Sequence, residues 1–177
     1  MKRLFLSVAV VGCGGGDQSW SYDGVKAVDL AVSSGEIEVL TSDDGQTHVE
    51  WSGGGVGDNA RPDVWLDGNG TLVVDAAGGI LGGGELSVWV PAQVGVHAHA
   101  ARGEVSVILA NPSDVHGCVG AGEVSVAVPA GLYFIDAAVG AGSIDSDLVH
   151  DPEAEWTLSA CAGAGEVSFT TYRDATE

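Results

Sequence analysis

The chain has 177 residues, 28 of them glycine, and it carries 25 acidic side chains against 6 basic ones, a formal net charge of −19. This charge excludes a protein that grips nucleic acid or an anionic membrane surface through a basic face. Because 45% of the residues are apolar, a wholly disordered chain is excluded as well, and the length suits one domain with its own core.

The first residues have the pattern of a secretory signal peptide. Lys2 and Arg3 precede an apolar stretch from Leu4 to Val11, which is too short to cross a bilayer. The following Gly12-Cys13 completes a segment that resembles the bacterial lipobox, in which a peptidase cuts before the cysteine and its sulfur takes a diacylglycerol. The resemblance implies a lipoprotein signal peptide over residues 1–12 and a lipid anchor at Cys13. The alternatives are an ordinary signal peptide or a buried first strand with a chance cysteine.

Residues 13–23 are predicted to form a lipidated, flexible tether, because Gly14 to Ser21 are mostly glycine and small polar residues. Lipoproteins of this kind with Asp directly after the cysteine tend to stay at the inner membrane. Here that position is Gly14, which favours the outer membrane in a Gram-negative cell. We therefore expect a lipid-anchored protein of the bacterial cell envelope, facing the periplasm or the surface.

Residues 24–80 contain short strand-like pieces separated by turn-rich segments such as Ser42-Asp43-Asp44-Gly45. We interpret them as irregular opening coils of the domain that follows, since terminal coils must close the core. The predicted strands are residues 27–30, 36–40, 47–51, 64–66 and 71–75.

A six-residue phrase then recurs along the chain, in which one leading residue is followed by a segment that is mostly glycine–acidic–apolar–polar–apolar in character. Apolar residues alternate with other residues within and before each phrase, which indicates strands with one buried face. One inward column, predicted to fill the interior, consists of Val105, Val124, Ile144 and Val167. Two strand arms in each coil of about 19–20 residues, joined at a glycine, predict an all-β fold: a single-stranded parallel β-helix or β-solenoid over 24–172, with 173–177 as a C-terminal tail. The phrase glycines are Gly84, Gly103, Gly122, Gly142 and Gly165, with an outlying copy at Gly35.

The recurring phrase and its Val-Pro-Ala step, at Gly84–Ala92 and Gly122–Ala130, resemble the putative-adhesin family of bacterial envelope proteins. The resemblance covers residues 24–172. It implies an all-β solenoid without established catalytic residues, a structural or adhesion-type role, and an envelope protein or a glycan as partner.

The alternation also predicts an outward cluster of metal-ligating side chains. If the apolar residues within 96–100 and 115–119 point inward, the residues between them point outward on coils about 4.8 Å apart. Three imidazoles and a thiolate suit zinc or copper, so a metal-binding protein is the alternative function. Otherwise these are solvated side chains on an outer face. The cluster comprises His97, His99, His116 and Cys118, with Asp136 in line on the next coil.

Cys118 and Cys161 are predicted to be free thiols. Each stands four residues before the glycine of its coil, and Ala138 has that place in the coil between them. Two coils are about 9.6 Å apart, beyond the Cα separation of about 7 Å that a disulfide tolerates.

Two further outward features are candidate sites. Glu85, Glu104 and Glu123 should stack in one column, with Glu166 beyond Ser143. Such a column can recruit a cation such as Ca²⁺ or remain solvated. Trp89 lies on the outward side as well, either as a contact for a glycan or protein or as a cover for the seam between irregular and regular coils.

The sequence predicts no catalytic residue and no organic cofactor. It has few basic residues, short loops, and none of the hydrolase, zinc-protease, P-loop or dinucleotide-binding motifs. A non-catalytic protein is therefore expected, and a glycan-active β-helix enzyme is the third option.

Overall fold

The computed structural model describes residues 17–53, 61–76 and 83–172. The predicted signal peptide (1–12), the predicted lipidation site at Cys13 and the predicted tail (173–177) lie outside these residues. The described residues form β-strands and contain no helix, so none of their elements is a long apolar helix that could cross a membrane. The strands are β1 (Asp17–Tyr22), β2 (Ala27–Val32), β3 (Gly35–Thr41), β4 (Thr47–Gly53), β5 (Asp63–Leu66), β6 (Thr71–Ala76), β7 (Gly84–Val90), β8 (Gly95–Ile108), β9 (Val115–Val128), β10 (Leu132–Ser146), β11 (Val149–His150) and β12 (Thr157–Thr171).

All twelve strands belong to one mixed sheet. Its main path runs β1-β4-β7-β3-β8-β9-β12-β10-β11, while β2 pairs with β6 and β8, and β5 pairs with β6. The pairs β1·β4, β4·β7 and β5·β6 are antiparallel, and the remaining pairs are parallel. The all-β prediction is confirmed, and so are the five strands predicted between residues 27 and 75. The sheet is mixed and not closed, which differs from the predicted parallel β-helix.

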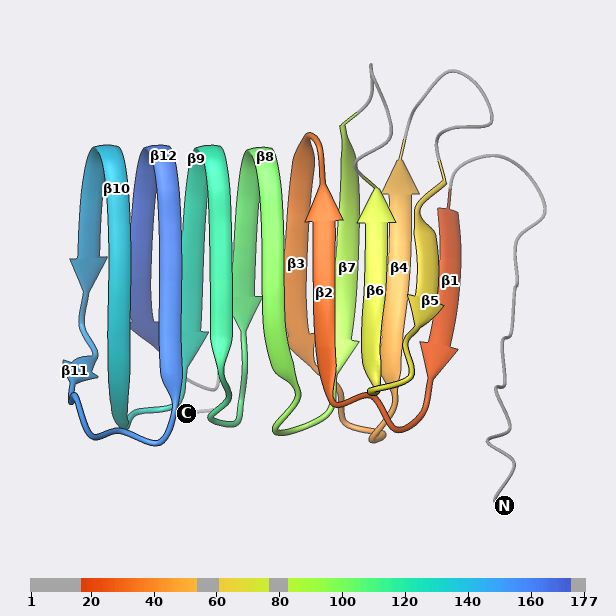
Figure 1. Cartoon of the computed structure of the whole chain (residues 1–177), viewed down its shortest axis with the longest axis horizontal. Helices are drawn as coiled ribbons and strands as arrows, with labels where there is room; N and C mark the ends of the chain where they lie inside the picture. The colour runs from red at the N-terminus through yellow and green to blue at the C-terminus, as the bar shows by residue number, and fades with distance from the viewer. Residues whose placement is uncertain (1–16, 54–60, 77–82, 173–177) are drawn as a thin grey trace.

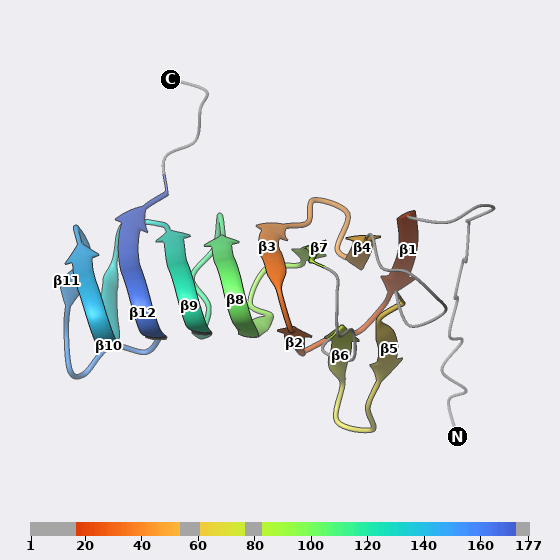
Figure 2. The same cartoon turned by 90° about the horizontal axis from the view of Figure 1, so that it is seen from above.

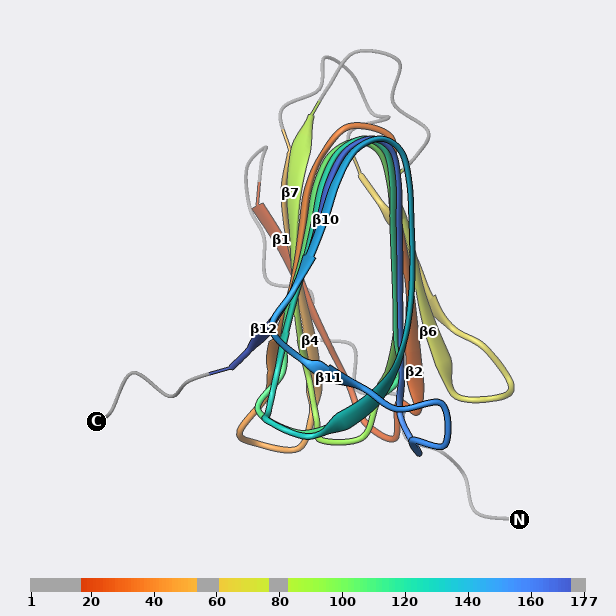
Figure 3. The ribbon, with the colours of Figure 1, turned by 90° about the vertical axis from the view of Figure 1, so that its left-hand side faces the viewer.

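The sheet is folded into two walls that meet at the top of the molecule (Figure 3). Each long strand, such as β8, runs up one wall, bends, and returns down the other (Figure 1). We call such a pair of arms an arch; β2 and β3 form one as well. In the first arm of β8, Val96, Ala98 and Ala100 are buried while His97 and His99 are exposed, as the alternation predicts. The inward side chains of the arches form one continuous apolar core.

Glycine at the bend lets neighbouring arches stack closely. Gly103 and Gly122 are register partners with φ angles of 119° and 141°, a region that side chains rarely adopt. A Cβ atom on Gly122 would overlap the carbonyl oxygen of Gly103. The same register row contains Gly35, Gly84, Gly142 and Gly165.

The arches do not stack in chain order, as the view from above shows (Figure 2). The last arch, β12, lies between β9 and β10, and the first, formed by β2 and β3, lies between β7 and β8 on the β3 wall. Ser146 of β10 and Phe169 of β12 are register partners on the inward side, and Phe169 is fully buried. The arch that carries Phe169 thus has the interior place, where this side chain is covered on both sides. Consequently Ile144 of β10, expected in the interior column of Val105, Val124 and Val167, is 49% exposed.

The ordered sheet begins earlier than predicted. Residues 17–22, assigned to the flexible tether, form β1, which pairs with β4 from Asp17↔Ser52 to Tyr22↔Thr47. Tyr22 is buried in the core, so β1 is an integral strand of the sheet.

Candidate functional site

The outer side of the arches carries an unbroken row of glutamates, each directly after a bend glycine. In spatial order the row runs across β7, β3, β8, β9 and β12 and consists of Glu85, Glu36, Glu104, Glu123 and Glu166. Together with the bend glycines these residues line an open, shallow hollow. The predicted column of Glu85, Glu104 and Glu123 exists, but Glu36 lies between the first two. Glu166 precedes Ser143 instead of following it.

The electrostatics of this row are repulsive. Partial burial raises the pKa of Glu104, and the carboxylates of Glu36, Glu123 and Glu38 raise it further. Each group that acts on Glu104 is therefore another acid. The row gives this face a strongly negative potential, which attracts cationic groups.

The predicted free thiols are wrong, because Cys118 and Cys161 form a disulfide. The prediction assumed that one coil separates the two residues. With β12 inserted beside β9, Cys118 and Cys161 are direct register partners, and their Cα atoms are 4.5 Å apart.

This disulfide removes Cys118 from the predicted metal-ligand set, because a metal requires the thiolate. The histidines do lie together: His97 and His116 are register partners with ring centroids 5.8 Å apart, and His116 Nε2 is 3.5 Å from Cys118 Sγ. Asp136 is not next to His116, since Ser159 of β12 lies between them. Among the residues that the structure describes, no group of three or more His, Cys, Asp or Glu side chains is arranged to hold a metal ion.

Trp89 is partly buried on the outward side of β7, between the buried Val88 and Val90. Its register partners are His48 on the antiparallel neighbour β4 and Leu40 on the parallel neighbour β3. Trp89 therefore lies where the sheet changes from antiparallel to parallel pairing.

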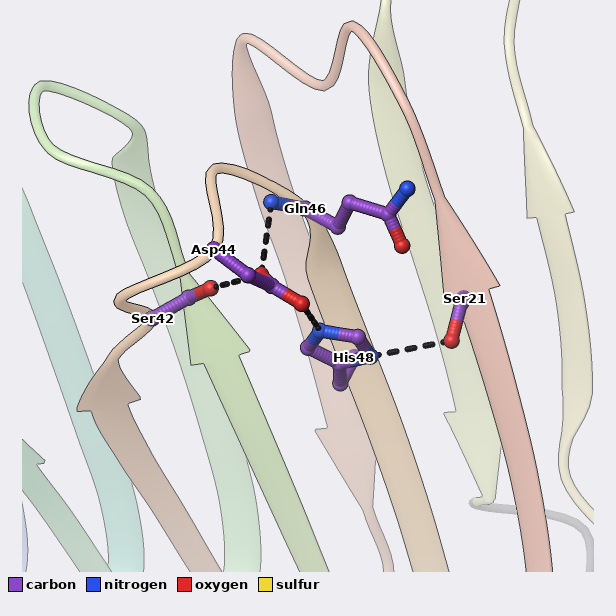
Figure 4. A network of polar contacts seen from close by, with 5 residues as sticks. All are labelled: Ser21, Ser42, Asp44, Gln46 and His48. Carbon is purple, nitrogen blue, oxygen red and sulfur yellow. Dashed lines mark hydrogen bonds and ion pairs between the residues drawn. The ribbon is translucent and has the colours of Figure 1, made fainter.

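A polar network that was not predicted from the sequence joins β1 to the turn between β3 and β4 (Figure 4). His48 Nε2 lies 2.8 Å from Asp44 Oδ2, and His48 Nδ1 lies 2.9 Å from Ser21 Oγ. Hydrogen bonds from the Gln46 backbone N–H, from Ser42 and from His48 lower the pKa of Asp44 to about 2. The ionised Asp44 carboxylate accepts a hydrogen bond from His48 Nε2, and His48 Nδ1 shares a hydrogen bond with the Ser21 hydroxyl.

This network has the residue types of a hydrolase triad, but its geometry is that of a structural contact between two neighbouring strands. Asp44 is 56% exposed, whereas the aspartate of such a triad is buried. Ser21 and His48 are cross-strand partners on β1 and β4, so their hydrogen bond fastens the edge strand. The four-residue spacing of Asp44 and His48 is visible in the sequence. Ser21 joins them only through the pairing of β1 with β4.

Comparison with solved structures finds one similar fold among the following matches. A putative cell adhesion protein from Clostridium sporogenes matches with a TM-score of 0.58 at 11% sequence identity, over 88% of this chain and 99% of that chain. A putative adhesin from Bacteroides fragilis matches with a TM-score of 0.29 at 11% identity, over 88% and 98% of the two chains. A putative adhesin from Parabacteroides merdae matches with a TM-score of 0.32 at 9% identity, over 90% and 97%. The last two scores are too low to support an argument.

No protein-family model matches the chain, and no curated protein matches its sequence. At 11% identity the first likeness concerns the fold alone. The chain thus shares its fold with the putative cell adhesion protein of Clostridium sporogenes.

Proposed function

We propose that the protein is a non-catalytic, lipid-anchored module of the bacterial cell envelope with a structural or adhesion-type role. The observation that carries this proposal is the stack of arches, which shares one core and presents two broad outer walls (Figure 1). Close stacking at the bend glycines makes such a body stiff, and stiffness suits a surface that must hold its contacts in register. The fold shared with a putative cell adhesion protein supports the same role.

At the level of fold, we propose that the arches from β2–β3 to β10 form a β-solenoid-like stack. The order of the arches in this stack differs from their order along the chain. The parallel register of β3, β8, β9, β12 and β10 supports this. Repeating units that can bury their inward side chains only against a neighbouring unit form stacks of this kind.

The anchor is tested by lipid labelling in a bacterial host. Cells that produce the full chain are fed an alkyne analogue of palmitate, and the protein is probed for the label. We expect label on the wild type and none on the Cys13→Ala variant, with the wild type in the membrane fraction. A labelled Cys13→Ala variant, or an unlabelled wild type, would refute the anchor.

The adhesion-type role is tested by retention of purified protein on envelope components: peptidoglycan sacculi, outer-membrane glycolipid and solubilised envelope proteins. We expect saturable retention on one of them without release of new reducing ends. Release of reducing ends from a glycan would instead support the third option, a glycan-active enzyme.

A metal-binding protein remains the second candidate, because the His97 and His116 rings lie 5.8 Å apart and His99 is on the same arm as His97. Its test is zinc titration by calorimetry of protein without a histidine tag, compared with a His97→Ala/His116→Ala double variant. Stoichiometric binding by the wild type alone would support it, and equal heats from both proteins would refute it.

A further inference from the structure

The β10 end of the sheet is open and apolar. Five large apolar side chains are exposed among the described residues, and four of them lie on β10 and β11: Leu132, Phe134, Ile144 and Val149, which are 37–59% exposed. Ile144 is on the inward side of β10, whereas Leu132 and Phe134 alternate with the buried Tyr133 and lie on the outward side. The inward residues of the first arm, Ile135, Ala137 and Val139, are only partly buried, whereas their counterparts in the interior arches are buried. The core is therefore uncovered at this end.

The backbone edge is covered on the first arm of β10 and uncovered on the second. On the first arm, β11 pairs with Leu132 and Tyr133, and His150 Nδ1 accepts a hydrogen bond from the Ile135 N–H. The chain then turns away at Asp151-Pro152. Among the described residues, no strand pairs with the outer edge of the second arm, Gly142–Ser146.

The hydrogen bonds of the second arm show which backbone groups are available. The Asp147 N–H donates to the Phe169 carbonyl oxygen, on the β12 side. Because successive residues of a strand direct their backbone groups to opposite sides, the groups of Ile144 and Ser146 face the open side. Ile144 is also the exposed inward residue, so an added strand would gain both backbone hydrogen bonds and an apolar contact here.

No other described strand of the chain covers this edge. The first described strand, β1, lies at the opposite end of the sheet (Figure 1).

Charge argues against a second copy and for a basic partner. Asp136 and Asp145 lie exposed on the outward side of the two arms of β10, and the chain carries a net charge of −19. Two copies joined edge to edge would bring these carboxylates together at one seam, and opposed like charges destabilise a strand pair. A partner strand with Lys or Arg on its outward side would instead meet Asp145 with opposite charge.

We propose that the Gly142–Ser146 edge of β10 binds, by strand addition, an extended segment of a partner protein in which apolar and basic residues alternate. The apolar residues cover Ile144 and the end of the core, and the basic residues face Asp145. This inference deepens the proposed surface role by naming the chemistry of a partner. Its test uses purified protein, so its failure leaves the lipid-anchor and retention experiments untouched.

The test uses fluorescent eight-residue peptides with capped ends, titrated with the full mature chain and its disulfide intact. The probe alternates Val and Lys; one control has the same composition in two blocks, and another alternates Val and Glu. We expect saturable binding of the Val/Lys peptide, at least tenfold tighter than either control. We also expect slower amide exchange at Ile144 and Ser146 in its presence.

Two matched variants locate the site. Ile144→Lys places a charge on the inward side of the edge and should weaken binding at least tenfold. Trp65→Lys alters the remaining exposed large apolar residue, on β5, and should leave binding unchanged. Equal affinity for both variants, or no preference for the alternating peptide, would overturn the proposal. A wild-type dimer in sedimentation that Ile144→Lys dissociates would overturn it as well, in favour of a second copy as the occupant.

Discussion

Cys118 and Cys161 lie opposite each other on β9 and β12, with their Cα atoms 4.5 Å apart, although 43 residues separate them in the sequence. The loop that this disulfide closes contains all of β10 and β11. The bond therefore fastens the last arch into its place between two arches that precede it in the chain.

Reduction of this disulfide should destabilise the protein. Closing a loop of this length removes much conformational entropy from the unfolded chain, which corresponds to about 2–4 kcal/mol. Urea unfolding with and without reductant measures the difference. A Cys118→Ser/Cys161→Ser double variant should have the same free energy of unfolding as the reduced wild type, and reductant should not change it. Peptide mapping of unreduced protein that finds the two cysteines unlinked would contradict the structure.

Neutralising the centre of the glutamate row should stabilise the protein. Because the pKa of Glu104 is raised in the folded state, the folded state binds this proton more tightly than the unfolded state. Its contribution to stability is therefore present at low pH and is lost as the pH rises through the folded-state pKa. Glu104→Gln should increase the free energy of unfolding at pH 7 by about 0.5 kcal/mol, as expected for opposed like charges.

The control for this experiment is Glu155→Gln, at an exposed position outside the row, which should have little effect. The gain from Glu104→Gln should shrink below pH 4 and at high salt, because protonation and screening both weaken the repulsion. A gain that is independent of pH and salt would show that repulsion within the row is not its cause.

Replacement of a bend glycine should be severe. Gly122→Ala forces a side chain into a positive-φ conformation, which costs about 1–3 kcal/mol, and its Cβ overlaps the Gly103 carbonyl oxygen. Gly45→Ala is the matched control, since Gly45 has a φ of 77° but no atom within 4 Å of the added Cβ. Thermal unfolding should show a clearly larger loss for Gly122→Ala. Equal losses of stability in the two variants would mean that the close approach of neighbouring arches adds nothing to the cost of Gly122→Ala.

Thr47→Val should stabilise the protein by about 1 kcal/mol. Thr47 is fully buried on β4, and its hydroxyl has no hydrogen-bond partner among the described residues. Ser113→Ala is the opposite case, because the buried Ser113 hydroxyl donates to the Val94 carbonyl oxygen at 2.6 Å. Ser113→Ala should lower the free energy of unfolding by about 1 kcal/mol, and urea unfolding measures both variants. A loss of stability in Thr47→Val would indicate that its hydroxyl is satisfied in solution.

The local structure of the protein could be read from its sequence, because strands have a period of two residues. The alternation around His97 predicted correctly which residues are buried, and the recurring phrase predicted the glutamate column through Glu104 and Glu123. The turn composition likewise separated the short strands between residues 27 and 75.

The order of the arches could not be read in this way. Every arch carries nearly the same phrase, so any two of them can pair in the same register, and periodicity does not tell which are neighbours. The predicted free thiols, the separation of Glu166 from Glu123 and the burial of Ile144 all depended on stacking in chain order, and all three were wrong.

The sequence by itself thus determined the short strands between residues 27 and 75, the inward and outward faces of the arches and the register at the bend glycines, since these follow from local alternation and spacing. The edge strand β1 was not among them, because its residues have the composition of a tether. Only the tertiary structure decided which arch is interior and which is the end. That choice depends on burial of the whole core, in which Phe169 is covered on both sides while Ser146 and Ile144 are left at the open edge.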